Sequence, residues 1–187
     1  DFTVSPSLNW NVDDWQYLGT RNVLGADQYL FGEIHQTTLS MAFRGSLTFT
    51  RALTLQVYAE PFYSAGRYTE FKRTANTRAA RYADRFDIFT GSRLQRDADG
   101  TVLIDINGDN ATDVQLDNPN FSFVSFRSNI VLRWEYRPGS TVFLVWQQNR
   151  SGFTTDGRYR FGDATRSLLD TRPENVFVVK VNYWLSL

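Results

Sequence analysis

The stretch Val176-Phe-Val-Val-Lys-Val-Asn-Tyr-Trp-Leu-Ser-Leu187 alternates between apolar and polar side chains. Its apolar row consists of Val179, Val181, Tyr183, Leu185 and Leu187, and its other row is mostly polar. Because a β-strand places successive side chains on opposite faces, the stretch predicts a strand with one apolar and one wet face. A free apolar strand edge promotes aggregation of a soluble protein, whereas a membrane barrel needs such a strand to complete its wall. We therefore expect a membrane β-barrel.

The composition of the 187 residues fits a single domain, residues 1–187, and excludes several classes of protein. No run approaches the roughly 18 apolar residues that a membrane-spanning helix needs. The chain has no cysteine, which excludes disulfides and thiol catalysis. The formal net charge is zero, which argues against nucleic acid as a partner. Except for Lys72 and Lys180, all the basic residues are arginine, the residue best suited to fixed pairing with carboxylates.

The same alternation recurs along the chain and predicts about eight strands. The predicted strands cover residues 8–18, 29–50, 53–68, 85–96, 101–106, 121–136, 142–148 and 176–187. Short connections near Arg51, Asp97 and Arg137 alternate with long ones near Gly19, Thr69, Gly108 and Asp156. This alternation is typical of an antiparallel up-and-down transmembrane β-barrel, whose short turns face the periplasm. We expect this fold in the bacterial outer membrane, with the C-terminus in the periplasm.

Three segments carry a resemblance to a protein family: Asn118-Pro-Asn-Phe121, Phe126-Arg-Ser-Asn-Ile-Val-Leu-Arg-Trp-Glu-Tyr-Arg-Pro-Gly-Ser-Thr-Val-Phe-Leu-Val-Trp-Gln-Gln148 and Asn175-Val-Phe-Val-Val-Lys-Val-Asn-Tyr-Trp184. They resemble the C-terminal part of the DUF5916 family, from Gly32 onward. The resemblance implies an outer-membrane barrel protein, and family members often carry an N-terminal, family 9-like carbohydrate-binding domain. Family chains are much longer and that domain is absent here, so the chain resembles the C-terminal portion of a larger barrel protein. The resemblance implies no residue with an established activity.

A run of oxygen-bearing side chains suggests a calcium loop. Asp105, Asn107, Asp109 and Asp113 are spaced like the first ligands of such a loop, and Gly108 permits the sharp bend. The twelfth-position Glu of an EF-hand is missing, and the flanking residues are typical of strands. The alternative is a solvated turn, because Asp, Asn and Gly dominate turns in general. A calcium ion is thus the one candidate cofactor.

Charged residues also fall on the polar parity of the predicted strands. This set consists of Arg44, Glu60, Arg127, Arg133 and Glu135. One interpretation is a lumen-facing charge lattice that filters anionic solutes. The other is structural, because small barrels fill their interior with paired charges.

A basic run follows the third predicted strand. It contains Arg67, Lys72, Arg73, Arg78 and Arg81, with Arg85 at its end. Arginine binds phosphate strongly, so the run is a candidate surface for lipopolysaccharide; the alternative is an ordinary solvated loop.

Several aromatic residues lie near predicted strand ends, where an interfacial girdle of a barrel would lie. They include Trp10, Trp134, Tyr136 and Tyr183, whereas Trp184 lies on the polar parity and is expected to point inward. His35 is the only histidine, and no recognised catalytic motif surrounds it.

The sequence therefore predicts an outer-membrane protein that acts as a pore, an anchor or a structural envelope component and that is not an enzyme. Its expected partners are outer-membrane lipid, lipopolysaccharide and other envelope subunits. Two alternatives stay open: a soluble β-sandwich or barrel that binds saccharide or calcium, and an outer-membrane hydrolase.

Overall fold

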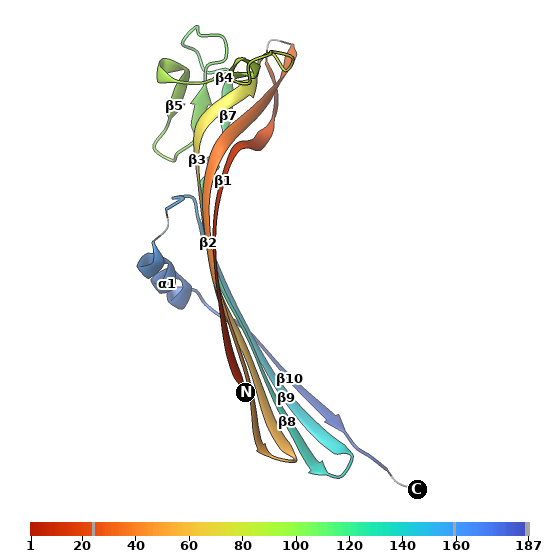
Figure 1. Ribbon diagram of the computed structural model, residues 1–187. Coiled ribbons are helices and arrows are strands. Elements are labelled where there is room, and N and C mark those ends of the chain that lie inside the picture. The colour runs from red at the N-terminus through yellow and green to blue at the C-terminus, as the bar shows by residue number, and fades with distance from the viewer. Residues whose placement is uncertain (24, 159, 186–187) are drawn as a thin grey trace.

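The computed structural model describes residues 1–23, 25–158 and 160–185, which fold into antiparallel β-sheets. The main element is a long, curved sheet, which we call the wall (Figure 1). Within the described residues, its strands follow the order β1 (Phe2–Val23), β2 (Ala26–Thr50), β3 (Leu53–Thr74), β8 (Phe121–Arg137), β9 (Ser140–Thr154) and β10 (Glu174–Asn182). A short seventh strand, β4 (Phe86–Ile88), pairs with the far end of β3. The predicted all-β, antiparallel fold is confirmed.

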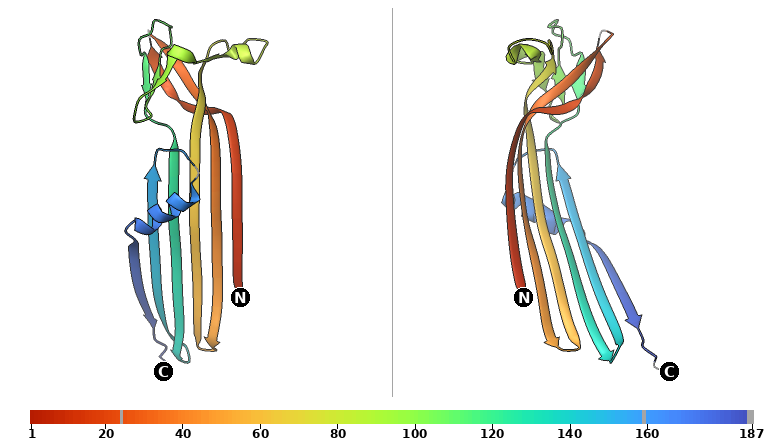
Figure 2. Two further views of the ribbon diagram at one scale, coloured as in Figure 1. Left: turned by 90° about the vertical axis from the view of Figure 1, so that its left-hand side faces the viewer. Right: turned by 45° about the vertical axis from the view of Figure 1, so that its right-hand side comes forward.

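Two tight turns lie at one end of the wall, which we call the turn end (Figure 2). Arg51 and Ala52 join β2 to β3, and Pro138 and Gly139 join β8 to β9. Gly139 has a φ of 79°, a left-handed conformation that favours glycine, and a Cβ there would lie 3.0 Å from Cβ of Trp184. These turns confirm the short connections predicted near Arg51 and Arg137.

The loop predicted at residues 19–28 is wrong. β1 continues to Val23, and β2 begins at Ala26, so that residues 19–23 pair with residues 26–30. Two irregularities in β1 pairing lie between Asp13 and Gln16 and between Tyr17 and Gly19, where the predicted loop would begin. Asn22 and Asp27 resembled turn formers in the sequence, but they pair with each other across β1 and β2 in regular register.

Residues 75–120 leave the wall and form a separate unit at its other end, which we call the cap. It contains two short 3₁₀ turns, η1 (Ala83–Arg85) and η2 (Gly91–Arg93), and a small sheet of β5 (Leu94–Arg96), β6 (Val102–Ile104) and β7 (Val114–Leu116). The strands predicted at 85–96 and 101–106 are therefore found only in part: β4 pairs with β3 of the wall, whereas β5 and β6 belong to the cap sheet and not to the wall. The predicted turn near Asp97 joins β5 to β6 in the cap and does not lie at the turn end.

The cap shares a buried apolar core with the wall. Val102, Ile104, Val114 and Leu116 are buried there, and Ile104 is 0% exposed. They pack with side chains from the cap end of the wall: Leu30, Ile34, Tyr68 and Phe71. Burying these side chains supplies roughly 1.5–3 kcal/mol each, which holds the cap against the wall.

A ten-residue helix, α1 (Phe161–Asp170), interrupts the long connection between β9 and β10. The helix lies across one face of the wall (Figure 2). Its Leu168 packs against Tyr63, Ala65 and Val124. The sequence predicted the long connection near Asp156 but not the helix within it.

The wall is an open sheet in the part of the chain that the structure describes. Its edges are β1 and β10, and these two strands do not pair with each other, so the predicted closed barrel is not found. The terminal strand β10 ends at Asn182; the predicted row residues Val179 and Val181 lie in it, whereas Ser186 and Leu187 lie outside the described residues. Within those same residues, no helix has the length and apolarity to cross a membrane.

Candidate functional site: a two-faced wall and an arginine cleft

One face of the wall is apolar across six strands, and much of it is exposed. The strand registers align side chains of one parity into continuous rows, as in Leu47, Leu55 and Leu132, or Val57, Ile130 and Trp146. Leu47 is 52% exposed and Phe177 is 71% exposed. This apolar face comprises Phe2, Val4, Leu8, Trp10, Leu39, Met41, Phe43, Leu47, Leu55, Val57, Ile130, Leu132, Trp134, Val142, Leu144, Trp146, Phe177, Val179 and Val181.

The apolar face is bounded along the strands. On β3 it runs from Leu53, near the turn end, to Tyr63. The next side chains of the same parity are Ala65 and Arg67, and Arg67 lies opposite His35 of β2. Trp134 lies beside Leu53 at the turn end, whereas Trp10 lies beside Thr37 just beyond the level of Tyr63. The apolar rows therefore form a band of limited height with tryptophan near both margins, and on β9 the row already changes to Gln148 and Arg150 beyond Trp146.

The opposite face carries the charged residues that the sequence predicted to lie on the polar parity. Tyr58 links two of them, Glu60 and Arg44. The hydroxyl of Tyr58 donates a hydrogen bond to Oε2 of Glu60 at 2.6 Å, and the guanidinium of Arg44 lies 5.2 Å from the Tyr58 ring centre. Arg127 is the register partner of Glu60, and both line the same recess. The structure thus brings Arg44, Glu60 and Arg127 together.

Arg133 and Glu135 form a separate pair near the turn end. Nη2 of Arg133 lies 3.1 Å from Oε2 of Glu135, and Oε1 of Glu135 accepts a hydrogen bond from the backbone N–H of Gly139 at 3.0 Å. These two residues stabilise the β8–β9 turn, which favours a structural role for them.

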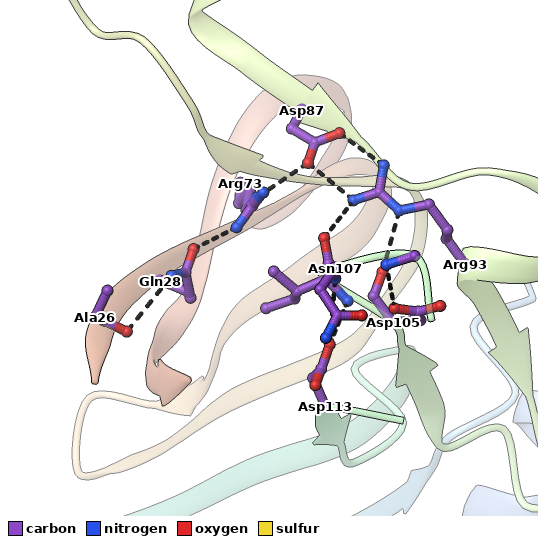
Figure 3. Close-up of polar contacts among 10 residues, drawn as sticks. Ala26, Gln28, Arg73, Asp87, Arg93, Asp105, Asn107 and Asp113 are labelled. Carbon is purple, nitrogen blue, oxygen red and sulfur yellow. Dashed lines mark hydrogen bonds and ion pairs between the residues drawn. The ribbon is translucent and has the colours of Figure 1, made fainter. Parts of the chain in front are cut away.

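A cluster of two arginines and one aspartate joins the cap to the wall (Figure 3). Arg93 donates two hydrogen bonds to Asp87, and Arg73 donates one to the same carboxylate and another to Gln28 of β2. Arg93 also donates to the backbone carbonyls of Asp105 and Ile106. The hydrogen bonds from Arg93, and then the one from Arg73, hold the pKa of Asp87 below its ordinary value despite its partial burial.

An open cleft of about 860 Å³ lies where the cap, β3 and the β9–α1 connection meet. Four arginines line it: Arg67, Arg96, Arg158 and Arg160. Nη2 of Arg96 donates to the carbonyl oxygen of Tyr68 at 2.8 Å, and its guanidinium lies over the Phe71 ring. Within the described residues, the guanidinium groups of Arg67 and Arg158 have no carboxylate partner.

Two asparagines fix the geometry of this cleft. Nδ2 of Asn118 donates to the carbonyl oxygens of Asp99 in the cap and Thr155 in the β9–α1 connection, each at 3.1 Å. Oδ1 of Asn120 accepts the backbone N–H of Tyr68 at 2.7 Å. Gly157 packs so closely that a Cβ would lie 2.8 Å from the carbonyl oxygen of Gly66. The three segments that border the cleft are therefore held together by short polar contacts.

A comparison with protein-family models matches residues 1–187 to a domain of unknown function, DUF5916. The chain belongs to the DUF5916 family. The predicted resemblance is confirmed and covers the whole chain, not only the part from Gly32 onward. The comparisons with curated proteins and with solved structures found no match.

In this DUF5916 chain, the segments that carried the resemblance have structural roles. The segment from Asn118 to Phe121 holds the cleft together through its two asparagines, and the Phe121 ring fills the space where a Cβ of Gly66 would lie. The Arg-Pro-Gly-Ser sequence of residues 137–140 forms the β8–β9 turn.

The predicted calcium loop of the DUF5916 chain is closed by its own hydrogen bonds. The Asp105 carboxylate accepts the backbone N–H groups of Gly108 and Asn110, at 2.6 and 2.8 Å, and Oδ2 of Asp113 accepts those of Ile106 and Asn107. Burial alone raises the pKa of Asp105, but the backbone hydrogen bonds outweigh it and leave the pKa below its ordinary value. Asn107 and Asp109 likewise cap backbone groups of the loop. Calcium binding stays a prediction.

The predicted basic surface is divided among several environments. Lys72 is 2% exposed, and its Nζ lies 2.8 Å from Oε1 of Glu70 and 4.0 Å from the Trp15 ring centre. The sequence predicted a lysine on a ligand-binding surface, whereas the structure buries this side chain against Glu70 and Trp15. Arg73 belongs to the cap–wall cluster. Arg78 and Arg81 are exposed on the cap, and Arg67 lies in the cleft. Sequence reasoning missed Arg96, Arg158 and Arg160, which approach Arg67 from distant segments.

His35 contacts Oε1 of Glu33 on the exposed surface beyond the apolar band. Among the residues that the structure describes, no three His, Cys, Asp or Glu side chains gather to hold a metal ion. Neither observation adds a catalytic arrangement to the DUF5916 chain.

Proposed function

We propose that this chain forms part of the wall of an antiparallel β-barrel in the bacterial outer membrane, where it acts as a pore, an anchor or a structural component and catalyses no reaction. The observation that carries the proposal is the exposed apolar face, which spans six strands and lies opposite a face that is polar on β1, β2 and β3 and carries both polar and apolar side chains on β9 and β10. A soluble protein rarely exposes a continuous apolar patch of this extent. In a membrane, the same face is covered by lipid.

The height of the apolar band supports this assignment. A tilted barrel strand crosses the hydrocarbon region with about 9–11 residues, and the outward apolar band of such barrels is about 25 Å tall. The row from Leu53 to Tyr63 on β3 has this length, and the wall strands continue beyond it toward the cap. The tryptophans near its margins, Trp134 and Trp10, fit the interfacial positions that tryptophan favours.

The placement of the other units fits the same orientation. Ile34 and Tyr68, which pack against the cap core, share the polar parity of Arg44 and Glu60. The cap core therefore packs on side chains of the polar parity at the far end of the wall, whereas α1 packs on the apolar parity at Tyr63 and Ala65. Tight turns at one end and a large excursion at the other match periplasmic turns and extracellular loops.

The test compares neighbouring positions of opposite parity in the full-length protein. Because the chain has no native cysteine, Val57→Cys and Gln56→Cys each give one labelling site within this region. With an environment-sensitive fluorophore in lipid vesicles, we expect brominated lipid to quench the probe at residue 57 strongly and the probe at residue 56 weakly. Equal quenching at the two positions, or a folded protein that needs no detergent, would refute the membrane wall. The second result would favour a soluble module.

A further inference from the structure

We propose that the arginine cleft binds the phosphate groups of a phosphorylated lipid-linked saccharide in the outer leaflet, the chemistry of lipopolysaccharide. This inference rests on the proposed membrane wall and assigns its lipid contact to named residues: Arg67, Arg96, Arg158 and Arg160. Arginine suits the role because its planar, forked guanidinium bonds phosphate at two points.

The cleft lies at the depth where headgroups begin. Arg67 has the same parity on β3 as Val57 and Tyr63 and lies four residues beyond Tyr63, about 13 Å along the strand at about 3.3 Å per residue. It therefore lies on the lipid side, just beyond the apolar band.

The β9–α1 connection lies on the same side of the wall. The hydroxyl of Tyr63 donates to the carbonyl oxygen of Arg158 at 2.7 Å, and the backbone N–H of Arg160 donates to the same hydroxyl at 3.3 Å. Helix α1 follows directly and packs its Leu168 on Tyr63 and Val124. On the lipid side of the wall, Arg158 and Arg160 therefore lie directly beside the apolar contact of Tyr63 with Leu168.

The cleft holds positive charge that its own carboxylates leave available. Burial lowers the pKa of Arg96, and the nearby charge of Arg67 lowers it further, so two cations lie close together. In the part of the chain that the structure describes, Arg160 forms a long ion pair, 3.6 Å to Asp163, and its charge also acts on Asp156. Such an arrangement attracts an anion, which relieves the repulsion between the guanidinium groups.

The cleft also contains three carboxylates, and two of them are engaged. Glu70 is paired with buried Lys72. Asp156 accepts hydrogen bonds from Ser122, Thr154 and the backbone of residue 158. The third, Asp99, lies on the cap turn at the border of the cleft. Asp156 keeps its negative charge in these neutral contacts, so Asp99 and Asp156 lie against four arginines and the lining of the cleft is net positive.

The size and rigidity of the cleft suit a phosphorylated sugar. Ligand sites commonly enclose about 300–1,000 Å³, and the cleft has about 860 Å³. The hydrogen bonds of Asn118 and Asn120 connect its three segments before any ligand arrives. A preformed site of this kind loses little entropy on binding.

The experiment uses the full-length protein in detergent micelles and measures binding by native mass spectrometry. The probes are a bisphosphorylated glucosamine disaccharide lipid, its dephosphorylated form, and free glucose 1-phosphate. The test variant is Arg67→Gln/Arg158→Gln, and the matched control is Arg78→Gln/Arg81→Gln, which removes the same charge from exposed positions on the cap. Both pairs are exposed, so we expect the variants to fold; a heat-modifiable band on a gel checks this.

We expect the test variant to lose about ten- to a hundredfold in affinity for the bisphosphorylated lipid, as the loss of charge-assisted hydrogen bonds implies, and the control to change by less than about twofold. The wild type should prefer the phosphorylated lipid to its dephosphorylated form. Equal losses in both variants, or no preference for phosphate, would overturn the inference.

The quenching test at residues 56 and 57 separates this inference from the membrane wall. Strong quenching at residue 57 without a phosphate preference refutes the cleft alone. Weak quenching there, with arginine-dependent binding of glucose 1-phosphate, refutes the lipid source and the wall together.

Discussion

Arg93 and Asp87 form a two-point ion pair, with Nη1 to Oδ1 at 3.0 Å and Nη2 to Oδ2 at 2.9 Å. The pair links η2 to β4, and β4 is itself paired with β3 of the wall. Arg73 donates to the same carboxylate from β3, so one aspartate receives cations from both units. The docking of the cap therefore depends on Asp87.

Replacing this carboxylate should loosen the cap. Asp87→Asn removes the carboxylate that Arg73 and Arg93 share, and we expect a loss of about 1–3 kcal/mol in the stability of the cap. Hydrogen exchange followed by mass spectrometry should show faster exchange of residues 86–106. The control is Asp84→Asn, which removes an exposed carboxylate on η1. Equal exchange rates in the two variants would contradict the role of Asp87.

The same pair predicts a dependence on pH. The pKa of Asp87 is lower in the folded protein than its ordinary value, because Arg93 and Arg73 stabilise the ionised form. Its contribution is therefore complete above the unfolded pKa of about 4 and is lost as pH falls through the folded pKa. We expect the exchange protection of residues 86–106 to fall below about pH 4, with a flatter profile in Asp87→Asn. A wild-type profile as flat as that of the variant would exclude this linkage.

A single charge should distinguish the two faces of the wall. Val57→Arg places a guanidinium in the middle of the apolar band, where lipid-facing arginine costs about 2–4 kcal/mol, whereas Gln56→Arg adds it to the polar face. We expect a smaller heat-modifiable, folded fraction in vesicles for Val57→Arg than for Gln56→Arg. Equal folded fractions would argue against a lipid-facing band.

The loop at residues 105–113 should hold its shape without an ion, because backbone N–H groups already occupy its carboxylates. We expect Asp105→Ala to speed hydrogen exchange in the loop equally in calcium and in chelator, and the wild type to show no gain in protection with calcium. Protection that rises with calcium in the wild type, and not in Asp105→Ala, would support the ion site that the sequence suggested.

Most of the wall could be predicted from the sequence because the alternation that specifies each long strand lies within that strand. Alternation alone locates the long strands, and Pro138 with Gly139 specifies a tight turn. The predictions fail where one local sequence pattern is compatible with two different local structures. Gly19 lies in an irregular part of a strand, whereas its surroundings resemble a loop. The three-residue strands of the cap are too short for a clear period, and their partners are chosen by packing around Val102 and Ile104.

The candidate sites could likewise be predicted only where their residues lie on neighbouring strands. The parity of β2, β3 and β8 places Arg44, Glu60 and Arg127 on one face, and the structure brings them together. The cleft depends on contacts between distant segments: Arg67, Arg96 and Arg158 belong to β3, the cap and the β9–α1 connection. No spacing in the sequence predicts that these three segments come together. Asn118 and Asn120, which connect them, lie in a segment that carried the family resemblance.

The pairing of β3 with β8 makes the cap an insertion between adjacent wall strands. Phe121 returns to the wall opposite Gly66, whereas β3 runs on to Thr74, so β2 and β3 extend beyond β8 and support the cap. Insertions are tolerated best at exposed loop tips rather than at buried contacts. A foreign epitope inserted at an exposed tip of the cap would therefore keep the β3–β8 register and be displayed on the side away from the tight turns.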